Sequence, residues 1–161
     1  MEHIRKEAQT RKRIQGDLLQ YAKDGQFNLI VHGCNCFCTM GAGIARSIKA
    51  QFPAAYAADL QTTAGDRTKL GTCTVAAIAL EHGDLRVVNA YTQYHYRGKG
   101  RKVEYDAVRS CMAWIKANYP GLRIGLPKIG AGLAGGDWET IAHIIDEELA
   151  GEHVTLVEFV P

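Results

Sequence analysis

The chain has 161 residues, 47% of them hydrophobic and 22% charged, so we expect residues 1–161 to form a single soluble globular domain with a full core. No apolar run reaches the length of a membrane span and the first thirteen residues are polar and basic, which predicts a cytoplasmic protein with no membrane partner. The net charge of +2 gives no case for non-specific binding to nucleic acid.

The first predicted elements are a strand and two helices. Residues 28–32 form a short apolar run, which is typical of a buried strand. From Gly43 onward, apolar residues fall on one face of a helix that ends at Pro53, and a second helix follows over residues 54–60. Strands are predicted at 72–80 and 85–90, and the short polar turn at 82–84 favours an antiparallel hairpin.

The second half of the chain continues the alternation of helices and strands. Apolar residues recur at helical spacing over 103–118, and a buried strand is predicted at 122–126. A helix then covers the region from Ile141 to Leu149, and 154–160 form a last strand. This alternation favours an α/β fold, a three-layer α/β/α sandwich around a mixed central sheet. Ligands of such sheets bind beyond the carboxyl ends of the strands.

Two glycine-rich turns, at residues 32–45 and 127–138, each lead from a strand into a helix. Glycine lets backbone amides approach an oxyanion, and the start of a helix adds free N–H groups and a positive dipole end. One such turn is a weak signal. Two in one domain predict a ligand that is held from both sides of a diphosphate.

Other phosphate and metal motifs fit poorly. Arg46 stands where a dinucleotide fingerprint needs its third glycine, and no Gly-Lys-Ser/Thr follows a glycine loop. Cys34, Cys36 and Cys38 lack the usual spacing of zinc ligands, so we expect reduced thiols and neither metal nor cofactor. Two basic clusters, at 11–13 and 97–102, fit a solvated turn or strand edge better than a docking patch for a polyanion.

His32 and Asn35 lie at the first glycine turn. Each has a structural interpretation, as a core histidine and as a turn residue. Beside a bound phosphate, however, a neutral imidazole can transfer a proton and a carboxamide can hold a ribose hydroxyl.

Several motifs in order resemble the macrodomain, an ADP-ribose-binding module of α/β/α architecture. They are Gln15-Gly-Asp-Leu-Leu19, the Asn35 loop with Met40-Gly-Ala-Gly-Ile-Ala45, Phe52-Pro-Ala-Ala-Tyr56, Lys69-Leu-Gly71, and Pro127-Lys-Ile-Gly-Ala-Gly-Leu133 followed by Asp137-Trp138. The chain is most similar to the branch that contains the ADP-ribose 1″-phosphate phosphatase, the terminal ADP-ribose protein glycohydrolase and the antitoxins that remove ADP-ribose from DNA.

The resemblance implies a binding role for specific residues. Asp17 is expected to bind the adenine amino group with backbone help from Leu18, and Asn35 to hold the distal ribose. The diphosphate is expected to lie against Gly41, Ala42, Gly43 and Ile44. The second turn is expected to close over it through Ile129, Gly130, Ala131, Gly132 and Leu133, with Thr92 and Gln93 completing the ligand site.

The resemblance also separates possible chemistries. The glycohydrolase and antitoxin lysine falls on Gln93, and the glycohydrolase aspartate on Ala134, so a covalent route through lysine is missing. The phosphatase shares the stretch His32-Gly-Cys-Asn-Cys36 and its catalytic histidine. We therefore expect a phosphatase acting on ADP-ribose 1″-phosphate, with His32 as acid/base, Asn35 orienting the ribose, and Asp137 as either a second acid or a helix cap. The alternatives are a non-catalytic ADP-ribose reader and a hydrolase that removes ADP-ribose from protein or nucleic acid.

Overall fold

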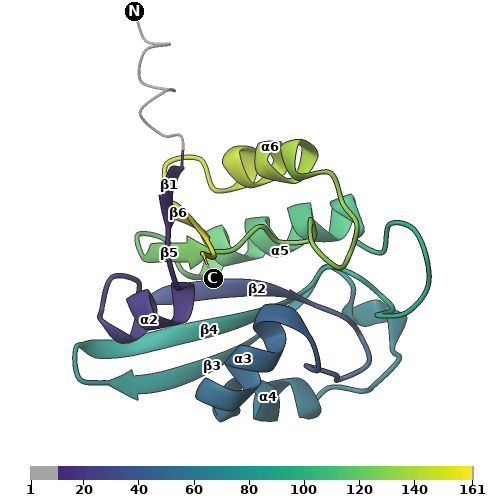
Figure 1. Cartoon of the computed structure of the whole chain (residues 1–161), viewed down its shortest axis with the longest axis horizontal. Coiled ribbons are helices and arrows are strands. Elements are labelled where there is room, and N and C mark those ends of the chain that lie inside the picture. The colour runs from purple at the N-terminus through teal and green to yellow at the C-terminus, as the bar shows by residue number, and fades with distance from the viewer. Residues whose placement is uncertain (1–10, 161) are drawn as a thin grey trace, which may run out of the picture.

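The central sheet sets the architecture, which we describe from a computed structural model for residues 11–160 (Figure 1). In this part of the chain six strands pair in the order β1-β6-β5-β2-β4-β3. β3 and β4 are antiparallel, and the other neighbours are parallel, so the sheet is mixed as predicted. The strands are β1 (Lys12–Gln15), β2 (Leu29–Cys34), β3 (Cys73–Leu80), β4 (Gly83–Tyr91), β5 (Arg123–Leu126) and β6 (His153–Glu158).

Helices cover both faces of this sheet, which confirms the predicted α/β/α layers. In Figure 1, α5 and α6 lie on one face and α3 and α4 on the other. No helix within residues 11–160 is long and apolar enough to cross a membrane. The helices are α2 (Leu18–Lys23), α3 (Gly43–Gln51), α4 (Pro53–Leu60), α5 (Tyr105–Asn118) and α6 (Trp138–Glu148), with a short 3₁₀ turn, η1 (Arg67–Lys69), before β3.

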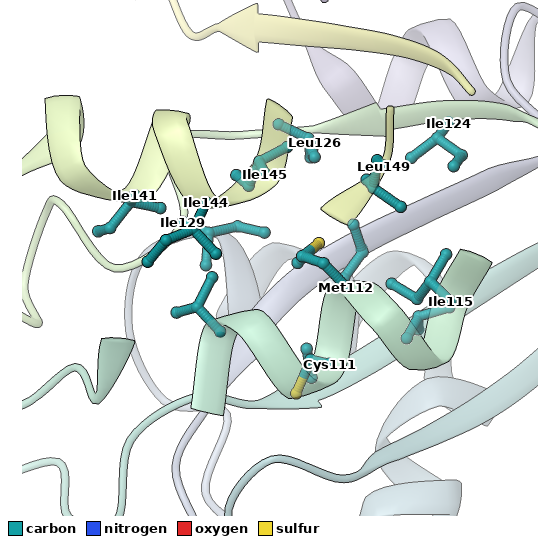
Figure 2. Close-up of a cluster of buried hydrophobic side chains, with 14 of the residues drawn as sticks. Cys111, Met112, Ile115, Ile124, Leu126, Ile129, Ile141, Ile144, Ile145 and Leu149 are labelled. Atoms are coloured by element: carbon teal, nitrogen blue, oxygen red, sulfur yellow. The ribbon is translucent and has the colours of Figure 1, made fainter. Parts of the chain in front are cut away.

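The larger core lies between the α5–α6 layer and the sheet (Figure 2). Cys111, Met112 and Ile115 recur at helical spacing on α5 and are fully buried. They belong to one buried cluster with apolar side chains from α6, among them Ile141 and Ile145. Each fully buried large apolar side chain of this kind contributes about 1.5–3 kcal/mol, so this contact fixes the α5–α6 layer on the sheet.

The edge strand β1 is an element that the sequence did not predict. It pairs in parallel with β6 and includes part of the basic cluster at 11–13, which therefore lies at a strand edge. Arg11 pairs with Asp146 at 2.6 Å, and Arg13 pairs with Glu158. The prediction about the first thirteen residues falls mostly on residues 1–10, outside the described part of the chain.

Several predicted boundaries need correction. Leu80 pairs with Gly83, so residues 81–82 form the hairpin turn and β4 begins at Gly83, two residues before the predicted start. The helix predicted from residue 103 begins at Tyr105, because Val103 is used in an isolated bridge with Gln93. The last strand ends at Glu158, which leaves Phe159 exposed beyond the sheet.

Candidate functional site

Two adjoining cavities lie where the glycine turns meet. The first, of about 540 Å³, is lined by Gly16, Asp17, Leu18, Leu19, Gly43, Ile44, Ser47, Gln51, Pro127, Lys128, Val157, Glu158 and Phe159. The second, of about 550 Å³, is lined by Gly33, Cys34, Asn35, Thr39, Gly41, Ala42, Gly43, Ile44, Ala45, Gln93, Tyr96, Lys102, Pro127, Lys128, Ile129, Gly130, Gly132, Leu133 and Ala134. Their shared residues, Gly43, Ile44, Pro127 and Lys128, place the junction of the cavities at the start of α3.

The N-terminus of α3 provides anion-binding groups at this junction. Ala42 is the N-cap residue and makes no side-chain capping bond, so the amides of the first turn are not used by a cap. The helix dipole adds a partial positive charge at the same place. Gly43 has φ +58°, a left-handed conformation that favours glycine and lets the chain enter the helix without a side chain over the cavity.

The second glycine turn faces the first across the second cavity. A Cβ built on Gly43 would lie 3.9 Å from Leu133 Cδ1, so the two turns are close together. Leu133 is 73% exposed, whereas Ile129 is buried and anchors the turn. The amide of Gly136 donates to the carbonyl of Gly130 at 2.7 Å and closes the turn on itself. Ala131 lines neither cavity, whereas its neighbours Gly130 and Gly132 line the second.

Gly136 gives a test of how tightly this turn is packed. A Cβ at Gly136 would lie 2.5 Å from Val103 Cγ1 and 2.7 Å from the Gly130 carbonyl oxygen. We expect Gly136→Ala to lower the free energy of unfolding by about 1–3 kcal/mol through overpacking. Gly132→Ala is the matched control, because a Cβ there meets nothing within 4 Å. Equal stability of the two variants in urea denaturation would contradict the packing described here.

The first cavity contains both residues that were predicted to contact adenine. Asp17 is the N-cap of α2, and its Oδ1 accepts the amide hydrogens of Leu19 at 3.0 Å and Gln20 at 3.3 Å. Asp17 is exposed, and its other carboxylate oxygen, Oδ2, makes no hydrogen bond within residues 11–160, whereas the neighbouring Leu18 is buried. Phe159, which was not predicted to be a site residue, also lines this cavity, with 73% of its surface exposed. Its only signal in the sequence was an aromatic residue near the end of the last predicted strand, over 154–160.

Asn35 lines the second cavity, but its carboxamide also holds the loop in shape. Its Oδ1 accepts the amide hydrogen of Phe37 at 2.8 Å. Its Nδ2 donates to Thr39 Oγ1 at 2.7 Å and to the Thr39 carbonyl at 3.2 Å. Both donor hydrogens are therefore used within the loop, and Asn35 shapes the wall of the cavity.

His32 is fully buried and lines neither cavity, although its ring contacts Cys34, which lines the second, and this corrects its predicted position at the mouth of the first turn. It is fully buried on β2 and bonds through Nε2 to Asn89 Oδ1 at 2.7 Å. Asn89 Nδ2 donates to the Ala55 carbonyl at 2.9 Å, which turns its oxygen toward His32 and makes His32 Nε2 the donor. Burial lowers the pKa of His32 from 6.5 to about 4, although the bond to Asn89 acts in the opposite direction. His32 is thus a neutral core histidine.

The other predicted polar residues divide between the cavity and the surrounding structure. Gln93 lines the second cavity, and its Nε2 donates to the His95 carbonyl at 2.8 Å. Thr92 is fully buried behind Gly33 and lines neither cavity, which corrects its predicted ligand contact.

Asp137 caps a helix, which confirms one of its two predicted roles. Its Oδ2 accepts from the amide and the hydroxyl of Thr140 at the start of α6, at 3.0 and 2.7 Å. These bonds lower the pKa of Asp137, which keeps it ionised and unsuited to donate a proton. It lines neither cavity.

The charged groups of the second cavity are all cationic. Its lining within residues 11–160 includes Lys102 and Lys128 but no Asp, Glu or His. Cys34 also lines it, but burial raises the pKa of this thiol well above its ordinary value, so it is not a ready nucleophile. The five cysteines are free thiols, and the described residues contain no group of three acidic, His or Cys side chains suited to a metal ion. The cavity therefore offers amide donors and ammonium groups, which are ligands for anions.

Comparison with known proteins identifies the family. Residues 31–145 match the sequence profile of the Macro domain, and the chain belongs to this family. It is 36% identical over 157 residues to a 17.5 kDa protein from the tk–vs intergenic region of enterobacteria phage T4, covering 93% of this chain and 97% of that protein. A shorter stretch of 45 residues is 49% identical to an ADP-ribose 1″-phosphate phosphatase of Aspergillus oryzae, covering 28% of this chain and 21% of the phosphatase.

Solved structures share the fold over nearly the whole chain. A Bacteroides thetaiotaomicron protein of unknown function superposes with a TM-score of 0.76 at 27% identity, covering 94% of this chain and 99% of that one. Thermosipho africanus DarTG, solved in complex with ADP-ribose, superposes with a TM-score of 0.70 at 20% identity, covering 91% of this chain and 41% of that one. The latter similarity establishes the fold alone.

Proposed function

We propose that the protein binds ADP-ribose, with adenosine in the first cavity, the diphosphate at the junction and the distal ribose in the second cavity. The observation that carries this proposal is the position of the α3 N-terminus between two cavities of similar volume. In ADP-ribose the diphosphate links two ribose groups, so the negative charge lies in the middle of the ligand. The free amides and the dipole of α3 lie at the matching place, the junction of the two cavities. The solved ADP-ribose complex of a protein with the same fold supports the proposal.

The residues at the two ends suit the two ends of this ligand. Asp17 has a carboxylate oxygen available to accept the adenine amino hydrogens, and Phe159 offers an aromatic face beside it. Asn35 and Gln93 line the opposite end, where a ribose would be enclosed by the second glycine turn. Lys128 lines both cavities, so its ammonium group lies near the proposed position of the diphosphate, and its ion pair with Glu158 at 3.1 Å partly offsets that positive charge.

Hydrolysis of ADP-ribose 1″-phosphate is a second candidate function. The short match to a fungal phosphatase of this specificity favours it. His32 and Asp137 line neither cavity, so a phosphatase would depend on water attacking a phosphate that Lys102, Lys128 and backbone amides stabilise. Binding without turnover fits the lack of an acid/base side chain in the described lining better, and it is the function that we place first.

Two measurements separate these candidates. Calorimetry should give one bound ADP-ribose per chain, with NAD much weaker, because its nicotinamide must fit where the second glycine turn closes. Phosphate release from ADP-ribose 1″-phosphate then reports turnover, and its absence leaves the protein as a reader. Tight NAD binding without ADP-ribose binding would refute the assignment of the cavities.

Asp17 offers a test of the adenine end. We expect Asp17→Ser to raise the Kd for ADP-ribose about tenfold, since a hydrogen bond to a charged group contributes about 1.5–3 kcal/mol. Serine is chosen because it is also a good N-cap, so α2 keeps its amide partner. Asp17→Ala removes both the helix cap of α2 and the proposed hydrogen bond to adenine. Its thermal unfolding, compared with that of Asp17→Ser, measures the contribution of the cap to stability. Unchanged affinity of Asp17→Ser, for ADP-ribose and for its inosine analogue, would place adenine elsewhere.

A further inference from the structure

Lys69 is a buried lysine that makes no ion pair. Only 6% of the residue is exposed, and within residues 11–160 its ammonium group contacts no carboxylate. Its Nζ donates to the Cys36 carbonyl at 3.1 Å and to Cys38 Sγ at 3.6 Å, and it lies 4.7 Å from the ring centroid of Tyr91. Buried charges in proteins are normally paired with an opposite charge. The contact between this buried amine and a thiol therefore calls for a chemical explanation.

Cys38 is the thiol best placed to react with an oxidant from solution. Three of the five cysteines are buried, and the two half-buried ones are Cys38 and Cys73. Burial raises the pKa of the Cys36 thiol, in the same loop as Cys38, to about 11, which keeps it protonated and unreactive. Of the two half-buried cysteines, only Cys38 has a lysine amine within hydrogen-bond distance in the described part of the chain.

Other contacts keep the two side chains of this pair together. Cys38 Sγ donates to the carbonyl of Asp59, in the last turn of α4, at 3.3 Å. Lys69 is the last residue of η1, and its carbonyl accepts the hydroxyl hydrogen of Thr72 at 2.7 Å. The bond from Nζ to the Cys36 carbonyl holds the amine against the same loop. The sulfur and the nitrogen are therefore neighbours because the fold holds them there.

The loop that carries Cys38 also forms a wall of the second cavity. Asn35 and Thr39 line this cavity, whereas Cys38 does not. Asn35 Nδ2 donates to Thr39 Oγ1 at 2.7 Å, so the residue that follows Cys38 fixes the carboxamide of Asn35. A covalent S–N bond is much shorter than the present separation of 3.6 Å. Its formation would pull Cys38 toward η1 and displace Thr39.

We propose that Cys38 and Lys69 form a site of oxidative modification, at which hydrogen peroxide leads to a covalent bond between Sγ and Nζ. In the first step the Cys38 thiol is oxidised to a sulfenic acid, and the peroxide is reduced to water. In the second step the ammonium group of Lys69 gives one proton to water, and the resulting amine attacks the sulfur. The S–N bond forms, the S–O bond breaks, and the hydroxide leaves as water with a second proton from the nitrogen.

The product is a sulfenamide, which a thiol reductant converts back to the free thiol and amine. One peroxide is consumed, and the protein loses two hydrogen atoms in total. Formation of the bond does not depend on what the cavities bind. Its effect on the wall of the second cavity, a weaker binding of ligand, rests on the proposed binding of ADP-ribose.

Mass spectrometry of the full-length wild-type protein tests the bond directly. The protein is treated with hydrogen peroxide, its remaining thiols are alkylated, and it is then digested. We expect a peptide with Cys38 joined to a peptide with Lys69, lighter than the sum of the two by two hydrogen atoms, and absent after dithiothreitol. Sulfenic or sulfinic acid at Cys38 without this link, or a disulfide from Cys38 to another cysteine, overturns the proposal.

Variants test whether the link needs both atoms. Cys38→Ser and Lys69→Gln each remove one reacting group and should form no link, and Lys69→Gln keeps a donor for the Cys36 carbonyl. Cys73→Ser removes the other half-buried thiol and should form the link as the wild type does. Loss of the link in Cys73→Ser would overturn the assignment to Cys38 and Lys69. If Lys69→Gln fails to fold, the wild-type peptides decide the question.

Calorimetry with ADP-ribose provides a separate readout of the cavity wall. Peroxide should raise the Kd of the wild-type protein about tenfold, the scale of one lost hydrogen bond, and dithiothreitol should restore it. Cys38→Ser should show no change of Kd with peroxide. A linked protein with an unchanged Kd overturns the effect on the cavity. Failure of the reduced wild-type protein to bind ADP-ribose refutes the proposed function instead, and the peptide measurement still decides the link.

Discussion

Gly43→Glu should abolish ADP-ribose binding while the fold is retained. The new carboxylate would lie at the start of α3, at the junction of the cavities, where the diphosphate is proposed to bind. Like charges about 4 Å apart repel by about 4 kcal/mol at an effective dielectric constant near 20, which raises the Kd by at least about a hundredfold. Calorimetry with ADP-ribose measures the loss, and circular dichroism measures the fold.

Two further variants separate charge from backbone strain. Gly43 has φ +58°, so any side chain there costs about 1–2 kcal/mol of stability. Gly43→Ala carries this strain without the charge and should keep most of the binding. Ala50→Glu places the same charge on an exposed position of α3 that lines neither cavity, and it should bind normally. A folded Gly43→Glu protein with wild-type affinity would show that the α3 turn is not the cradle.

The parts of the fold that could be predicted from the sequence have a strong local signal. α5 repeats its apolar residues at helical spacing, and the β3–β4 hairpin joins two apolar runs through a short polar turn. β1 has no such signal, because it is a four-residue edge strand with only Ile14 half-buried among polar neighbours. Its pairing depends on β6, which is far along the chain.

The candidate site shows the same division. Gly43 and Gly130 both have a positive φ, which favours glycine, so the glycine residues of the sequence mark the positions of the two turns. Lys102 and Phe159 belong to the cavities only through the tertiary arrangement, and nothing in their local sequence indicates this. The adjacent residues Thr92 and Gln93 differ in that only Gln93 reaches the second cavity.

His32 shows most clearly why a motif does not fix the position of a side chain. Successive side chains of a strand point to opposite faces, so a residue next to a glycine turn can face the ligand or the core. A Cβ at Gly33 would lie 2.7 Å from Thr92 Oγ1 and 3.3 Å from Ile129 Cγ2, toward the second glycine turn. His32 faces the other way, toward Asn89 and the α3–α4 layer.

The buried position of His32 predicts a loss of stability in mild acid. Its pKa is about 4 in the folded protein and 6.5 when exposed, so between these values the unfolded chain binds the proton more strongly. The contribution of neutral His32 to the free energy of unfolding is therefore fully present above pH 6.5, and it is lost as the pH decreases toward 4. Each pKa unit corresponds to about 1.4 kcal/mol, which gives a loss on the order of 3 kcal/mol from this one residue.

The difference between wild type and His32→Gln isolates this effect from other titrations. Asp59 acts in the opposite direction, because burial raises its pKa and the folded state therefore gains relative stability as that carboxyl is protonated. Glutamine can donate to Asn89 but cannot titrate, so the variant should lack the loss due to His32 in urea denaturation from pH 7 to 4.5. His143→Gln, which removes an exposed histidine, is the control and should retain the loss.

An NMR titration of the wild-type protein provides a measurement that does not depend on the stability of a variant. A His32 ring that takes up its proton near pH 6.5 in the folded protein would contradict the buried, neutral histidine and restore proton transfer by His32 as the mechanism to test.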